Sequence, residues 1–107
     1  MSDKRRHTRY AIKAENNYRI KIKIGNSVKQ GKIKDISVSG ICIFSDIETF
    51  LLLNQLYKFA IEKEDKELIS IEGRIIWSFP QQDAKEKLMY YGIEFSHFIT
   101  LPDEITS

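Results

Sequence analysis

Isoleucine and basic residues alternate without a break from Arg19 to Ile24, and this pattern constrains the fold more than any other feature of the chain. Successive side chains of a β-strand point to opposite faces, so the pattern places isoleucine on one face and cations on the other. We therefore predict a strand that is buried on one side and exposed to water on the other. Gly25, Asn26 and Ser27 follow with the composition of a turn, so the chain should reverse into a second strand.

Turn-forming residues divide the rest of the chain into segments with the composition of short strands. The predicted strands after the first run from about Val28 to Ile36, Ile41 to Phe44, Leu56 to Glu62, Leu68 to Phe79 and Leu88 to Phe95. In the fifth strand, we expect one side to carry Ile69, Ile71, Gly73, Ile75 and Trp77. Residues 46–54 fit either a short helical turn capped by Asp46 or a buried connector, and residues 80–87 fit a polar loop. Pro102 suits the first position of a short C-terminal helix.

Six short strands and almost no helix predict an all-β fold, a small six-stranded antiparallel barrel. The length of 107 residues suits one domain with a single modest core. We divide this domain into a basic arm over residues 1–16, a barrel over residues 17–98 and a tail over residues 99–107. The arm is polar and has no sustained periodicity, so we predict that it is flexible.

Positive charge is concentrated in the arm. The chain has 17 basic and 15 acidic residues, a net charge of +2, and its composition is that of a soluble globular protein. The first ten residues contain Lys4, Arg5, Arg6 and Arg9 against Asp3, which gives them an excess of three positive charges. The remainder of the chain is therefore close to neutral.

The single cysteine, Cys42, excludes an internal disulfide and fits a reducing compartment. It lies between two isoleucines of a predicted strand, so we interpret it as a small strand side chain and not as a reactive thiol. No apolar run approaches the ~20 residues of a membrane span, and no apolar stretch follows the charged N-terminus. We expect a cytoplasmic protein without a membrane span.

Two short motifs carry the chemistry. Arg5-Arg6-His7-Thr8-Arg9 is an R-x-x-x-R pattern, and Asp35-Ile36-Ser37-Val38-Ser39-Gly40 is a D-x-S-x-x-G pattern at the end of a predicted strand. Alone, the first is usually solvated charge, and the second is usually a turn whose Asp and Ser bond nearby backbone while Gly adopts a positive φ. Their combination within a barrel pattern makes a binding site the better interpretation.

In this order, the two motifs resemble those of the PilZ domain, the bacterial receptor module for cyclic di-GMP. The resemblance extends from about Lys4 to about Phe98, and the segments 73–77 and 91–95 resemble the last two strands of that family. It implies a six-stranded barrel without catalytic activity that signals to an unidentified downstream protein by ordering its arm around the ligand. It also implies ligand contacts from Arg5, Arg9, Asp35, Ser37 and Gly40, with Lys4, Arg6 and Trp77 as further candidates. Lys4 precedes the arginine motif at a position that influences whether one dinucleotide or a stacked pair is bound.

These residue types suit a guanine dinucleotide on chemical grounds. Guanine has two acceptors, O6 and N7, that fit the paired donors of arginine, and it has N–H donors that suit a carboxylate such as Asp35. Its phosphates also suit arginine. A guanidinium plane or an aromatic ring can stack on the flat purine.

Two other function classes remain open. One is a PilZ-type adaptor of pilus or motility machinery that does not bind the nucleotide, but such adaptors typically lack the arginine motif. The other is a small nucleic-acid-binding barrel, suggested by the basic stretch from Arg19 to Lys34. The small net charge and the lack of an evident aromatic platform make nucleic acid an unlikely partner. An enzyme is least expected, because we find no nucleophile–base pair, no phosphate-binding glycine loop and no spacing around His7 or His97 that would bind a metal.

Overall fold

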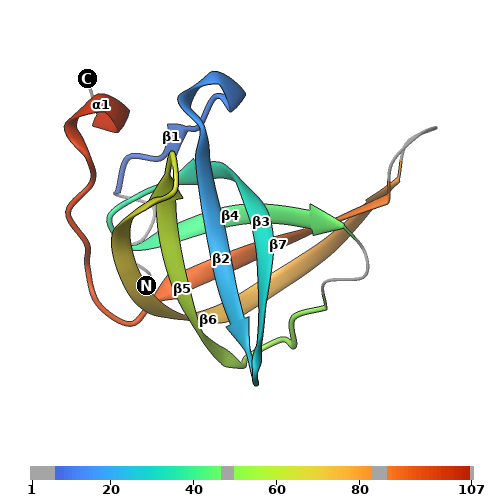
Figure 1. Ribbon diagram of the computed structural model, residues 1–107. Helices are drawn as coiled ribbons and strands as arrows, with labels where there is room; N and C mark the ends of the chain where they lie inside the picture. The colour runs from blue at the N-terminus through green and yellow to red at the C-terminus, as the bar shows by residue number, and fades with distance from the viewer. Residues whose placement is uncertain (1–6, 47–49, 83–86, 107) are drawn as a thin grey trace.

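The computed structural model describes residues 7–46, 50–82 and 87–106, and these form an antiparallel barrel (Figure 1). Its strands are β1 (Tyr10–Ala11), β2 (Tyr18–Ile24), β3 (Ser27–Ile36), β4 (Gly40–Asp46), β5 (Leu56–Lys63), β6 (Lys66–Gln82) and β7 (Lys87–Phe95). They are ordered β1-β3-β2-β5-β6-β7-β4, and β3 also pairs with β4. This last pairing closes β2 to β7 into a six-stranded barrel, as the sequence predicted, with β1 as an extra strand on β3.

The barrel interior is filled by the apolar side chains that alternate along its strands. Ile20 and Ile22 of β2 are fully buried, which confirms the inward face predicted from the alternation with lysine. The other strands contribute Ile33, Ile36, Ile41, Ile43, Phe59, Ile61, Ile71, Ile75, Met89, Tyr91, Ile93 and Phe95 to the same core. Burial of each large apolar side chain contributes roughly 1.5–3 kcal/mol, so this interior is the main source of stability.

The described strands contain three β-bulges. One lies near the start of β6, where Ile61 pairs with Ile69 and Glu62 with Glu67, and the other two lie in β3 and further along β6. In β3, Ile33 pairs with Ile43 and Asp35 with Cys42, which leaves Lys34 as the extra residue. In β6 the extra residue is Ile76, because Ile75 pairs with Ile93 and Trp77 with Gly92. A bulge adds one residue to one strand and so reverses the faces that follow. The sequence placed Trp77 on the same side as Ile75; this was wrong, because the bulge turns Trp77 to the outer face, where it is 42% exposed.

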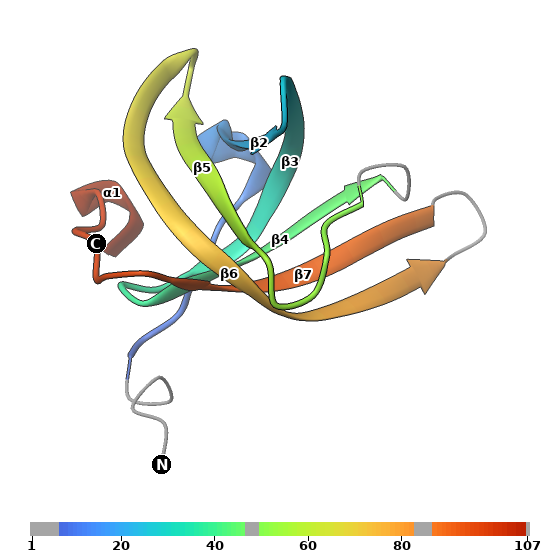
Figure 2. The ribbon, with the colours of Figure 1, turned by 90° about the horizontal axis from the view of Figure 1, so that it is seen from below.

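The hairpin of β6 and β7 is longer than the sequence predicted. Residues 80–87 were expected to form a loop, but β6 continues to Gln82 and β7 begins at Lys87; residues 83–86 are outside the described part. Figure 2 shows this hairpin extending beyond the barrel. The prediction was wrong because it ended the strand before Pro80. β5 pairs with β6 only as far as Arg74, so Pro80 lies in an edge segment, where a missing N–H is tolerated.

The described part of the arm is attached to the barrel. Tyr10 pairs with Ile36 and Ala11 with Asp35, and the Ile12 N–H donates to the Lys34 carbonyl at 2.9 Å. A short 3-10 helix, η2 (Ala14–Asn16), then leads into β2. The sequence predicted no strand before residue 17, because two residues are too few to show a period. The effect of β1 is to hold the end of the arginine motif beside the end of β3.

The connector between β4 and β5 is buried at one point and is not helical over residues 50–55, its described part. Leu51 is 2% exposed, and its N–H donates to the Tyr91 hydroxyl at 3.1 Å. Of the two sequence interpretations, the buried connector therefore holds here. Residues 47–49 lie outside the described residues.

The C-terminal tail passes the D-x-S-x-x-G turn before it ends in a short helix. The Phe95 N–H donates to the Ser39 carbonyl and the Ile99 N–H to the Val38 carbonyl, both at 2.9 Å. The helix α1 (Asp103–Thr106) begins immediately after Pro102, as predicted. Two polar contacts fix it to the barrel: Lys63 Nζ donates to both Glu104 carboxylate oxygens at 2.6 and 2.7 Å, and the Tyr18 hydroxyl also donates to Glu104.

The attachment of the tail should weaken in acid. Lys63, followed by the Tyr18 hydroxyl, holds the pKa of Glu104 below its ordinary value. A carboxyl group whose folded pKa is lowered stabilises the fold above its ordinary pKa of about 4.3, and this contribution is lost as the pH falls through the lowered value. We expect the amide signals of Ile105 and Thr106 to shift toward random-coil positions over that range. In Glu104→Gln these signals should not show this change with pH. If the signals of the wild-type protein also stay constant in acid, the tail is not held by the Glu104 carboxylate.

Candidate functional site

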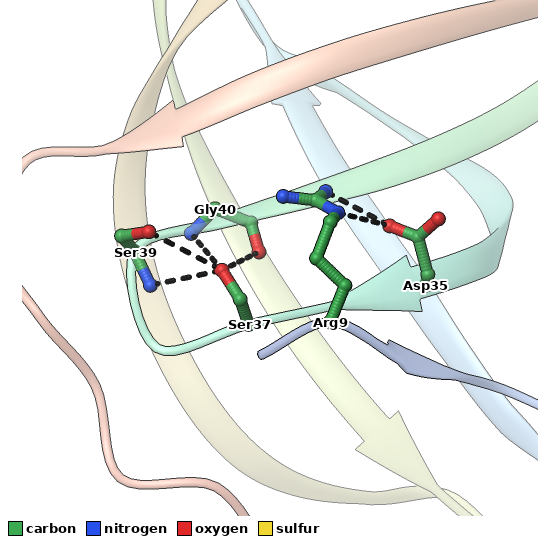
Figure 3. Close-up of polar contacts among 5 residues, drawn as sticks. All are labelled: Arg9, Asp35, Ser37, Ser39 and Gly40. Atoms are coloured by element: carbon green, nitrogen blue, oxygen red, sulfur yellow. Dashed lines mark hydrogen bonds and ion pairs between the residues drawn. The ribbon is translucent and has the colours of Figure 1, made fainter. Parts of the chain in front are cut away.

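An ion pair joins the two predicted motifs. Arg9 Nε donates to Asp35 Oδ1 at 2.9 Å, and an Arg9 terminal nitrogen lies 2.8 Å from the same oxygen (Figure 3). The strand β1 positions Arg9 by pairing with the end of β3, and the bulge at Lys34 turns Asp35 outward. The side chains are 45% and 25% exposed, so the pair contributes at most about 1 kcal/mol to stability. Both groups are therefore accessible, and their mutual contact can be exchanged at small cost.

The serine of the second motif shapes the turn between β3 and β4. Ser37 is fully buried, and its hydroxyl oxygen accepts the N–H groups of Ser39 and Gly40, each at 3.2 Å (Figure 3). The backbone N–H of Ser37 also donates to the Gly40 carbonyl at 2.8 Å. The described structure thus uses Ser37 as the turn interpretation requires. A contact between Ser37 and a ligand stays a prediction.

Gly40 is needed for close strand packing. A Cβ at this position would lie 2.6 Å from the Ile93 carbonyl oxygen of β7, a contact that real side chains do not make. Its φ is not in the left-handed region, so the positive φ that the turn interpretation of the isolated motif includes is not found here. The glycine is required because β4 and β7 approach closely here.

A row of paired residues crosses the outer face of four strands next to the ion pair. Asp35 of β3 pairs with Cys42 of β4, Cys42 pairs with Gly92 of β7, and Gly92 pairs with Trp77 of β6. We call these four residues the outer row. Asp35 and Trp77, at its two ends, each follow a bulge residue. The two bulges therefore bring a carboxylate and an indole ring to the same face.

A hollow of about 250 Å³ lies over the outer row. It is lined by Arg9, Lys34, Asp35, Ser39, Gly40, Cys42, Ile76, Trp77, Gly92, Ile93 and Glu94. Four residues predicted from the sequence meet here, namely Arg9, Asp35, Gly40 and Trp77. Ser37 lies behind the turn and does not line the hollow, and Lys4, Arg5 and Arg6 lie outside the described residues.

The Trp77 ring lies over Gly92. A Cβ added to Gly92 would be 2.0 Å from the indole Nε1, so any side chain there would displace the ring. Sequence reasoning did not identify Gly92 or Cys42 as part of the site. For Cys42 a signal existed, because a residue between two inward isoleucines must face outward. For Gly92 the sequence holds no such signal, because its place in the site comes from its pairing with Trp77, and that pairing depends on the bulge.

The Cys42 thiol forms an uncharged part of the floor of the hollow. Burial raises the pKa of Cys42, and the Asp35 carboxylate raises it further, against the opposing effect of Lys34 and Arg9. A thiol that stays protonated is a poor nucleophile, in agreement with the sequence interpretation. Among residues 7–46, 50–82 and 87–106, no group of three His, Cys, Asp or Glu side chains could hold a metal ion.

His7 connects the arm to the turn and to the tail. Its Nδ1 lies 2.9 Å from the Ser39 hydroxyl oxygen, and its ring contacts the Phe98 ring edge-on with centroids 5.0 Å apart. Ser39 in turn lies 3.2 Å from the Ser37 hydroxyl oxygen. The His7 side chain is half-buried, because the tail returns to this point.

The family model for the PilZ domain matches residues 3–106, so the chain belongs to the PilZ family. PilZ domains are binding modules and not enzymes. This places the chain in a class of binding proteins without catalytic activity. No curated protein matches this chain significantly. In the part of the chain that the structure describes, no helix has the length and apolar character needed to span a bilayer.

Several solved structures are similar in fold. The PilZ domain with c-di-GMP of YcgR from Escherichia coli aligns with a TM-score of 0.71 at 14% identity, over 88% of this chain and 79% of that one. The Borreliella burgdorferi PlzA protein in complex with c-di-GMP gives 0.70 at 16%, over 91% and 46%. The MrkH–c-di-GMP complex of K. pneumonia gives 0.74 at 20%, over 99% and 49%. The chain thus spans about half the length of the last two proteins, and at these identities the likeness shows the fold alone.

Replacement of Gly92 should expose the only tryptophan of the chain. In Gly92→Ala the new methyl group takes the space of the Trp77 indole, so the ring should leave the strand surface and enter water. We expect a red-shifted emission maximum and stronger quenching by acrylamide. Ser78→Ala changes an exposed neighbour in β6 and should leave both unchanged. An unaltered emission spectrum of Gly92→Ala would show that Trp77 does not pack on Gly92.

Proposed function

We propose that this protein is a receptor for cyclic di-GMP and that the ligand binds in the hollow over the outer row. The observation that carries the proposal is the meeting of Arg9, Asp35, Gly40 and Trp77 in one hollow, although they come from four separate segments. The family assignment supports it, and so does the fold likeness to the three similar proteins, each of which is in complex with c-di-GMP.

Each group in the hollow has a place in the binding of a guanine dinucleotide. The Asp35 carboxylate can accept the N–H donors of a guanine base, and Arg9 can donate to guanine acceptors or to a phosphate. The Trp77 indole offers a flat apolar ring on which a purine can stack. Lys34 lies at the edge of the hollow and can approach a phosphate as a point charge.

The size of the hollow indicates that other residues must complete the site. Pockets that bury most of a drug-sized ligand have volumes of about 300–1,000 Å³. The hollow of about 250 Å³ is smaller, so it holds only part of a dinucleotide. We assign the remaining contacts to Arg5, with Lys4 and Arg6 as further candidates, because they precede Arg9 in the chain and are positively charged. Whether one dinucleotide or a stacked pair is bound follows from how these residues contact it.

Binding requires the Arg9–Asp35 pair to rearrange. A half-exposed ion pair contributes at most about 1 kcal/mol, whereas each charged hydrogen bond to a ligand contributes roughly 1.5–3 kcal/mol. Exchange of the internal contact for ligand contacts is therefore favourable. The changed surface would then be recognised by a downstream protein, which is how a small domain without a catalytic site can transmit a signal.

A calorimetric titration with cyclic di-GMP tests the proposal and gives the stoichiometry. Arg9→Ala and Asp35→Ala should each weaken binding by about one to two decades, because each removes a charged hydrogen bond. Lys58→Ala, an exposed position of β5 that does not line the hollow, removes the same charge as Arg9→Ala and should bind normally. Wild-type protein that gives no heat with ligand near a millimolar would favour the adaptor alternative.

The arm should lose backbone motion on binding. Residues 3–6 have three cations and no large apolar side chain, so they cannot offset an ordering cost of roughly 1–2 kcal/mol per residue unless an anion is present. His7 and Tyr10 already contact the barrel, so we expect the change in residues 3–6 and not beyond Arg9. Amide relaxation with and without ligand measures this. Equal relaxation of residues 3–6 in the two states would rule out ordering of the arm as the signal.

A further inference from the structure

A second and larger hollow, of about 750 Å³, lies on the other side of Lys34. Its lining includes four cations, Lys13, Arg19, Lys32 and Lys34, and the apolar side chains of Phe44 and Leu88. We call this hollow the basic groove. Lys34 lines both the basic groove and the hollow over the outer row, so the two sites are neighbours.

The basic groove opens where β3 changes partners. Pairing of β2 with β3 ends at Gly31, and pairing of β1 with β3 begins at Asp35, so Lys32, Ile33 and Lys34 lie between the two. After β1 the chain turns away from β3 through η2 and returns in β2 (Figure 1). At Gly31 a Cβ would come within 3.3 Å of the Phe44 carbonyl oxygen, so there is little room for a side chain here. Gly31 therefore leaves this part of the groove wall without a projecting side chain.

The four cations are not neutralised by described residues. The ion pairs within residues 7–46, 50–82 and 87–106 are Arg9–Asp35, Lys21–Glu62 and Lys63–Glu104, and none involves a cation of the basic groove. Asp46 also lines the groove but has an interaction of its own. Four like charges around one hollow repel one another, so an anionic partner would be stabilised there.

Aromatic rings extend the groove on one side. The Phe44 ring stacks on that of Tyr90 at 5.2 Å and 24°, and the Lys34 ammonium lies 5.6 Å from the Tyr90 centroid. Phe79 pairs with Tyr90 across β6 and β7 and is 59% exposed. The sequence did not reveal this strip, because its three rings come from three strands. It offers apolar contact beside the cations, and aromatic rings are enriched in the cores of protein interfaces.

We propose that the basic groove is the docking site for an acidic segment of a partner protein, which presents carboxylates to the lysines and Arg19 and an apolar side chain to Phe44 and Leu88. The proposal does not depend on cyclic di-GMP binding, because it rests on the charge and shape of the groove alone. A segment of a few residues fills a hollow of this size. The apolar side chain of that segment can also contact the adjoining aromatic strip.

The surroundings favour a protein segment over a nucleic acid. A single strand needs a continuous positive track for its phosphates. Beyond Arg19, an adjacent hollow is lined by the acids Glu62, Glu64 and Asp65. A phosphate backbone that continued past the groove would meet these carboxylates, whereas a short acidic segment ends before them.

Selection from a library of random peptides tests the proposal without knowledge of the natural partner. We expect the peptides selected by the wild-type domain to be enriched in acidic residues next to Leu, Ile, Val or aromatic residues. A labelled selected peptide is then titrated, by fluorescence anisotropy, against variants whose thermal melts match that of the wild type. Enrichment in basic or uncharged peptides would overturn the proposal.

The variants separate the groove from general charge attraction. The double variant Arg19→Glu, Lys32→Glu should bind the selected peptide at least about tenfold more weakly, which corresponds to ~1.4 kcal/mol of binding free energy. Leu88→Ser should lower the affinity for the same peptide severalfold, because it removes an apolar contact. Lys58→Glu with Lys23→Glu makes the same charge change outside the groove and should have little effect. Equal losses in both charge-reversal pairs, or tighter binding of single-stranded oligothymidylate than of the peptide, would overturn the proposal.

Discussion

Two β-bulges, at Lys34 in β3 and at Ile76 in β6, determine where this barrel carries its polar chemistry. Without them, Asp35 and Trp77 would follow Ile33 and Ile75 into the interior, where an unpaired carboxylate costs several kcal/mol. Each bulge adds one residue and turns the next side chain outward. Because the two bulged strands lie on either side of β4 and β7, the carboxylate and the indole end up at opposite ends of one row.

The strands between the bulges supply the space for this site. Cys42 has a small side chain and Gly92 has none. Little therefore projects from the face between Asp35 and Trp77, and a hollow forms there. Gly40 has a related role at the end of the turn, where any side chain would collide with the backbone of β7. The arm and the tail then meet at the same turn, through Arg9 on Asp35 and through His7 between Ser39 and Phe98. The arm and the segment around Phe98 that leads into the tail are thereby coupled to one small region of the barrel.

Much of this could be predicted from the sequence, and the exceptions have physical reasons. Alternation of Ile and basic residues in β2 predicted an inward face that the structure confirms, because burial enforces a strict period. The outward position of Trp77 could not be predicted, since a bulge changes the period without leaving a mark in composition. The two-residue strand β1 was missed because two residues are too few to show a period. The basic groove depends on a gap between two partners of β3, a property of pairing that no local pattern encodes.

The central claim is that the hollow over the outer row binds cyclic di-GMP, and amide chemical-shift mapping with that ligand tests it most directly. The account predicts that the largest shifts fall on Ser39, Gly40, Cys42 and Gly92 and on the indole N–H of Trp77. Shifts of the same size elsewhere, such as along β2 and β5 on the other side of the barrel, would place the ligand at a different site. A spectrum that does not change at ligand concentrations near a millimolar would contradict the account altogether.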